Sequence, residues 1–144
     1  MSLRLIASLV VVLLISGSGC AKRRCEAARV EALPEWQRLQ TEIDRRLGDA
    51  RTVLEQADAG AGADSDSDAK RARNRFELIN FWSTNMHALT NSLAAAVDEG
   101  FQPTFASTVR ELSESVHGVN DPALNDLLTP ARRTAMNVVA ACQK

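Results

Sequence analysis

Residues 36–57 have the sequence WQRLQTEIDRRLGDARTVLEQA, with apolar side chains at intervals of three and four. This spacing places them on one side of an α-helix, which has about 3.6 residues per turn. Opposite charges four residues apart, such as Glu42 and Arg46, stabilise the helix further. Pro34 either opens this helix or kinks it. The pattern predicts a helix over residues 26–57 that buries Trp36, Leu39, Ile43, Leu47, Ala50, Leu54 and Ala57.

A linker and a second helix follow this segment. Residues 59–68, AGAGADSDSD, have the composition of a linker. Its aspartates alternate as in the first half of a calcium-binding loop, but such a loop requires a glycine and a glutamate where this chain has Ala69 and Arg75. We therefore expect the aspartates to keep the linker solvated and to favour the N-terminal end of a helix over residues 69–98, ended by Gly100.

Two more helices are predicted in the last third of the chain. One covers residues 103–117, ends at Gly118 and buries Phe105, Val109, Leu112 and Val116. The next begins with Asp121 as its N-cap and Pro122 in its first turn. Its apolar positions keep their phase across Pro130, which favours one continuous helix. These positions are Leu124, Leu128, Ala131, Ala135, Val138 and Cys142.

The fold class follows from these segments. No strand-like alternation of useful length is present, so we predict an all-α domain over residues 25–144. Four helices joined by short connections pack as an antiparallel up-down-up-down bundle. Three helices with a packed segment are the alternative.

The N-terminal residues have the pattern of an export signal. Arg4 precedes a mostly apolar run, Leu5–Ile15, that spans about 16 Å as a helix, half the thickness of a bilayer core. Small residues then lead to Cys20, and the segment resembles a bacterial lipoprotein signal, although Gly17 stands where a leucine is usual. The resemblance implies removal of residues 1–19, acylation of Cys20 and a lipid-anchored tether over residues 20–24.

The resemblance also implies a location. Ala21, rather than an aspartate, follows the lipid-bearing cysteine, which implies the outer membrane with the domain facing the periplasm. Lys22, Arg23 and Arg24 would then lie near anionic lipid headgroups. The alternative is an ordinary leader cut nearby, which leaves Cys20 free or paired.

Two cysteines remain for the domain when Cys20 carries lipid. An up-down-up-down bundle brings the end of its fourth helix beside the start of its first, where Cys142 and Cys25 lie. In an oxidising compartment this predicts a Cys25–Cys142 disulfide. The alternative is two unpaired thiols, with Cys142 packed as a small apolar residue.

The composition and motifs limit the function. A net charge of −1 without a basic patch gives no reason to expect a nucleic-acid partner. The chain has two histidines and no nucleophile elbow, zinc-protease motif or phosphate-binding glycine loop. We therefore expect a protein that is not an enzyme, has no cofactor and binds a protein partner.

The most unusual segment is LINFWSTNMHALTNSLAAAV, residues 78–97, which carries no formal charge. An aromatic anchor with amides around it suits a protein interface. The predicted partner-binding residues are Phe81, Trp82, Asn85 and His87. The alternative is a central helix contacted by its neighbours on several sides.

A carrier of a haem, a metal or another small ligand is the second function considered, because helical bundles hold such groups in their cores. It would use His87, Met86 and His117. A structural histidine at the edge of the core and a histidine near a helix C-terminus are the plainer interpretations.

Overall fold

The computed structural model describes residues 3–60, 65–95 and 104–142, with side chains at 19–60, 66–95 and 104–142. These residues form four helices and no strand. The all-α prediction is therefore confirmed. The helices are α1 (Leu3–Ala59), α2 (Ser65–Ala94), α3 (Phe105–Gly118) and α4 (Pro122–Cys142).

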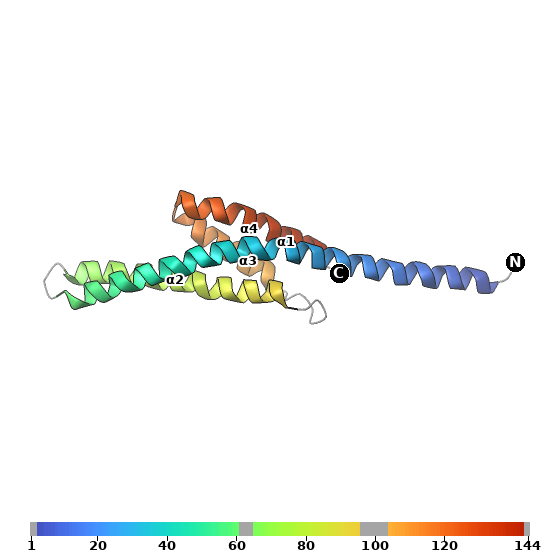
Figure 1. Cartoon of the computed structure of the whole chain (residues 1–144), viewed down its shortest axis with the longest axis horizontal. Coiled ribbons are helices and arrows are strands. Elements are labelled where there is room, and N and C mark those ends of the chain that lie inside the picture. The colour runs from blue at the N-terminus through green and yellow to red at the C-terminus, as the bar shows by residue number, and fades with distance from the viewer. Residues whose placement is uncertain (1–2, 61–64, 96–103, 143–144) are drawn as a thin grey trace.

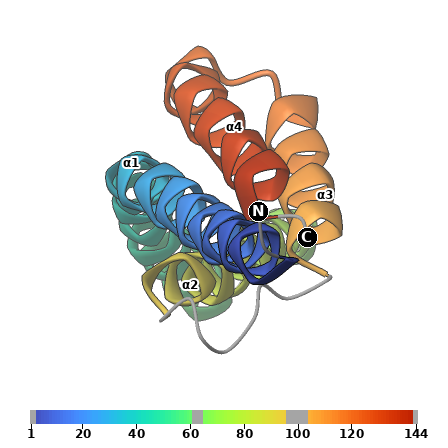
Figure 2. The same cartoon turned by 90° about the vertical axis from the view of Figure 1, so that its right-hand side faces the viewer.

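Each helix packs against two neighbours. α1 contacts α2 and α4, while α3 contacts α2 and α4, and no diagonal pair is in contact within the described residues. Figure 2 shows this cyclic order end-on, and Figure 1 shows that successive helices run in opposite directions. The predicted up-down-up-down bundle is confirmed.

The core lies where the four helices meet. In α1, Trp36, Leu39 and Ile43 have no exposed surface. The apolar positions predicted for α3 and α4 are buried along their whole length, apart from the half-buried Cys142. α4 passes through Pro130 without a break, as its continuous apolar side predicts. The core also contains Ile79, Trp82, Met86, Leu89 and Leu93 of α2.

α1 and α2 extend beyond the turn between α3 and α4 (Figure 1). We call this two-helix extension, residues 47–59 and 66–78, the arm. Within it only Ala50 and Ala72 are buried, because no third helix covers the pair. Leu47, Leu54 and Ala57 are half-buried, contrary to the prediction that they are core positions. The arm therefore contributes little to the core.

Two helix boundaries differ from their predictions. α1 runs without a break through Pro34 and upstream past residue 26, so the proline neither opens nor interrupts it. α2 begins at Ser65 rather than residue 69. Asp66 and Asp68 lie in its first turn, where carboxylates interact favourably with the helix dipole. The predicted end of this helix near Gly100 and the start of the next at residue 103 lie outside the described residues.

The first buried side chain in the described part of α1 is tied to the end of α4. The sulfur atoms of Cys25 and Cys142 lie 2.01 Å apart and their Cα atoms 4.7 Å apart, across 117 residues of sequence. The two cysteines predicted to pair are thus at disulfide distance. Cys20 is exposed and separate from them.

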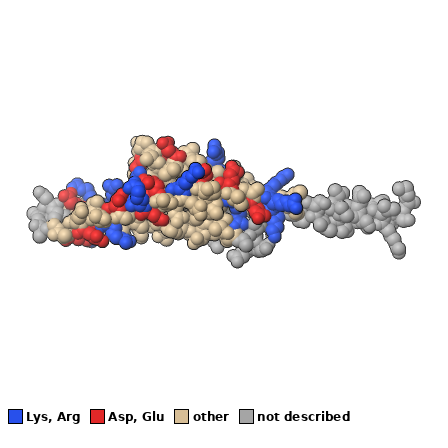
Figure 3. Space-filling model, in the orientation of Figure 1, with Lys and Arg blue, Asp and Glu red and all other residues tan. Residues whose placement is uncertain are grey.

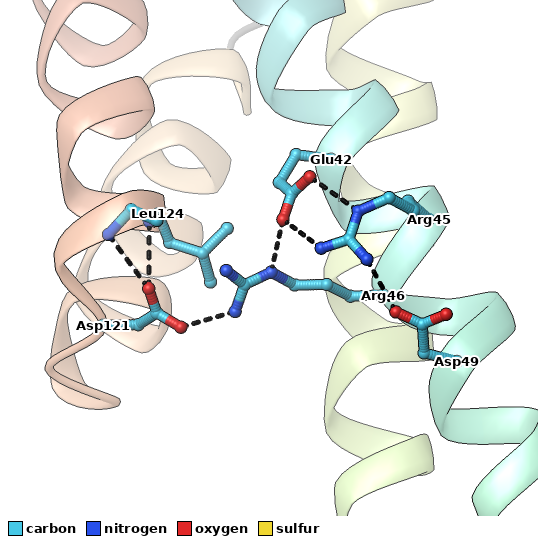
Figure 4. Close-up of polar contacts among 7 residues, drawn as sticks. Glu42, Arg45, Arg46, Asp49, Asp121 and Leu124 are labelled. Carbon is cyan, nitrogen blue, oxygen red and sulfur yellow. Dashed lines mark hydrogen bonds and ion pairs between the residues drawn. The ribbon is translucent and has the colours of Figure 1, made fainter.

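A second tie joins α1 to the start of α4. Asp121 Oδ1 accepts hydrogen bonds from the backbone N–H groups of Ala123 (3.0 Å) and Leu124 (3.2 Å), so Asp121 is the predicted N-cap. Its other oxygen accepts a hydrogen bond from Arg46 Nη1 at 2.5 Å (Figure 4). One carboxylate therefore caps α4 and holds it against α1.

Glu42 extends this tie along α1 (Figure 4). Its Oε1 atom accepts hydrogen bonds from Arg45 Nη2 at 2.7 Å and from Arg46 Nε at 2.8 Å. These hydrogen bonds, first from Arg45 and then from Arg46, lower the pKa of Glu42 from 4.5 to about 2. Arg46 likewise lowers the pKa of Asp121.

Replacing Cys25 with serine should lower the free energy of unfolding by about 4 kcal/mol, because a bond across so long a loop restricts the unfolded chain. Urea denaturation without reductant measures this loss. Cys142→Ser and the double variant should lose the same amount, while Cys20→Ser should match the wild type. Wild-type stability in either single variant would show that the two cysteines are not bonded.

Glu42→Gln should destabilise the protein at neutral pH by about 1 kcal/mol. A carboxylate with a lowered folded-state pKa stabilises the fold above its unfolded-state pKa, near 4.5, and loses this effect as pH falls toward 2. The wild-type and variant curves of unfolding free energy against pH should therefore converge between these values. A constant difference down to pH 2 would contradict the ion-pair assignment.

Candidate functional site

The outer side of α2 carries an exposed aromatic residue. Phe81 is 46% exposed, and Leu78, one turn before it, is 38% exposed. Asn85, one turn after Phe81, donates a hydrogen bond from its side-chain nitrogen to the Phe81 carbonyl at 2.8 Å. The amide of Asn85 is thus partly satisfied within its own helix.

Trp82 belongs to the core rather than to the predicted surface. It is 2% exposed, and its Nε1–H donates to the Ser115 hydroxyl of α3 at 2.8 Å. A buried indole requires such a partner for its N–H group. The prediction that Trp82 contacts a partner protein is therefore wrong, because its side chain lies between α2 and α3.

His87 lies on the side of α2 that faces α1, apart from Phe81. Its Nδ1 atom is 2.9 Å from Gln40 Nε2, and its Nε2 atom is 3.2 Å from Asp44 Oδ2. The Gln40 amide nitrogen also lies 3.3 Å from His87 Nε2, so it contacts both ring nitrogens. Ser83 donates to Asp44 Oδ1 at 2.6 Å. The four side chains form a polar cross-link between α1 and α2.

This cross-link contains the residue types of a hydrolase triad but not its connectivity. In a triad the histidine accepts the proton of the serine hydroxyl. Here the Ser83 hydroxyl donates to Asp44, and His87 binds the other oxygen of the same carboxylate. The histidine therefore does not accept the proton of the serine hydroxyl, as a triad requires, and the contacts support a structural role.

The three residues considered for a carrier lie in different places. Met86 has no exposed surface and packs in the core, whereas His87 is on the flank facing α1. His117 is near the end of α3, with its Nδ1 atom 3.2 Å from Asn125 Oδ1 of α4. Within the described residues, no group of three or more histidine, cysteine or acidic side chains is placed to hold a metal ion.

Arg29 is a buried charge that the sequence reasoning did not identify. It is 8% exposed and donates from Nε (3.0 Å) and Nη2 (2.7 Å) to the carbonyl oxygen of Leu93. This carbonyl is in the last turn of α2, where a cation interacts favourably with the helix dipole. The sequence spacing alone places Arg29 on the buried side of α1, because Arg29 continues the intervals of Cys25, Ala32 and Trp36.

The end of the bundle near Cys20 is basic. Lys22, Arg23 and Arg24 are all exposed, and Figure 3 shows basic side chains gathered where the described side chains begin. Among the residues that the structure describes, no helix is both long enough and apolar enough to cross a membrane.

Trp82→Ala should lower the free energy of unfolding by about 3–5 kcal/mol, because it removes a large core side chain and leaves a cavity. Phe81→Ala should cost less than about 1 kcal/mol, since much of that side chain is already in water. Chemical denaturation of both variants tests the two assignments. Equal losses would mean that Phe81 is not a surface residue.

Comparison of the chain with protein-family models, with curated proteins and with solved structures finds no match.

Proposed function

We propose that this protein is a lipid-anchored accessory protein that faces the periplasm and acts by binding another protein. The observation that carries the proposal is the exposure of Cys20 on α1, five residues before Cys25. Packing of the described side chains begins only at Cys25, which leaves Cys20 accessible for acylation. The lipobox-like residues before Cys20 support the same modification.

The distribution of charge supports an orientation. Lys22, Arg23 and Arg24 next to Cys20 attract anionic headgroups. From Cys20 to Ala59, α1 rises about 60 Å at about 1.5 Å per residue. With the basic end at the lipid, the arm would point away from the membrane.

The binding surface that we propose is the outer side of α2 around Phe81. A half-exposed aromatic ring with Leu78 and Asn85 beside it has the composition of an interface anchor and its polar surroundings. The surface that we propose is centred on Phe81 and does not include His87, whose side chain contacts α1.

Site-specific photo-crosslinking in cells that produce the protein tests both parts of the proposal. A photoreactive phenylalanine analogue at position 81 should give one discrete crosslinked product, found in the membrane fraction. The matched control is the same analogue at position 53, because Val53 is 51% exposed but lies on the arm. Cys20→Ser should release the protein from membranes and weaken the crosslink.

Two outcomes would contradict the proposal. Retention of the Cys20→Ser variant in the membrane fraction would contradict the proposal that a lipid on Cys20 anchors the protein. Equal products at positions 53 and 81, or none at 81, would show that Phe81 is not the binding surface.

A further inference from the structure

A groove runs between the end of α3 and the outer flank of α4. Its volume is about 400 Å³, within the range of known ligand-binding sites. It lies on different helices from Phe81, so it is independent of the proposed surface on α2. The lining residues are His117, Asn125, Leu128, Thr129, Arg132, Arg133 and Met136.

The charge in this groove is uncompensated. Arg132 and Arg133 are both exposed, and in the described part of the chain neither has an ion-pair partner. The consecutive pair Arg45 and Arg46 differs, because both bind Glu42. Among the described residues that line the groove there is no carboxylate. Two exposed guanidinium groups on consecutive residues, without a counter-charge, favour the approach of an anionic partner.

The groove also offers an apolar surface. Met136 supplies it, since this side chain is 45% exposed at one end of the groove, whereas Leu128 is 5% exposed and belongs to the core beneath. Methionine adapts its shape and is frequent at surfaces that bind partner helices. From Asn125 to Met136 the groove follows α4 for about 16 Å, which is about three helical turns.

The other polar groups are engaged internally. Asn125 Oδ1 contacts His117 Nδ1, and Thr129 donates to the Asn125 carbonyl at 2.9 Å. The arginines are thus the charged donors that the groove offers to a ligand. A bidentate pair between a guanidinium and a carboxylate is among the stronger charged contacts.

We propose that this groove binds an acidic amphipathic helix of a partner protein. The carboxylates of this helix pair with Arg132 and Arg133, and its apolar side packs against Met136. The uncompensated positive charge, the exposed Met136 side chain and the length of the groove together favour this occupant over a basic or uncharged segment.

Fluorescence anisotropy with a synthetic probe tests the proposal. The probe is a fluorescein-labelled helical peptide of leucine, alanine and glutamate, with leucines at intervals of three and four; a second peptide has glutamine for every glutamate. The full-length protein should bind the glutamate peptide, and the variant R132Q/R133Q should bind it about tenfold or more weakly. Met136→Ser should also weaken binding.

The matched control is K70Q/R71Q, which removes two adjacent exposed basic residues from the arm. It should bind like the wild type, as should Phe81→Ala, whose result separates this site from the proposed surface on α2. Equal weakening by both double variants would overturn the proposal, since binding would then follow net charge alone. Failure of the wild type to bind the glutamate peptide, or equal affinity for both peptides, would also overturn it.

Discussion

The attachment of α4 to α1 at both ends is the constraint on which the bundle depends. At one end Cys25 and Cys142 lie at disulfide distance, and at the other Arg46 binds the N-cap carboxylate of α4. The short helix α3 contacts only α2 and α4 within the described residues. Holding α4 in place therefore also holds α3 over the core. It thereby keeps the shape of the groove that α3 and α4 form.

The fold could be predicted because the apolar residues of its core recur along the sequence at helical intervals. The apolar positions of α4 step by four and three from Leu124 to Cys142, and nearly all of them are buried. That register, combined with the short connections, determines which helix ends meet, so the pairing of Cys25 with Cys142 followed from topology. Asp121 was identified as a cap for a similar reason, since its side chain accepts hydrogen bonds from the backbone two and three residues after it.

The candidate surface was harder to predict because it depends on which flank of α2 its neighbours cover. Phe81 and Trp82 are consecutive residues, about 100° apart around a helix. α3 covers Trp82, whereas Phe81 is exposed. Helical spacing cannot decide between them without the position of α3. Arg29 was missed because a charged residue in an apolar register is expected in water, whereas here a helix end supplies its hydrogen-bond acceptor.

The position of the Cys25–Cys142 pair has a mechanical consequence. A force that pulls on α1 from its N-terminal side reaches Cys25 before it reaches any other described core residue, and a bond there passes part of the load to α4. The two helices must then slide together past their neighbours, which strains many side-chain contacts at once. A force that separates α1 from α2 at the arm instead breaks their contacts one turn at a time, so the molecule resists pulling far better from the end that carries Cys20.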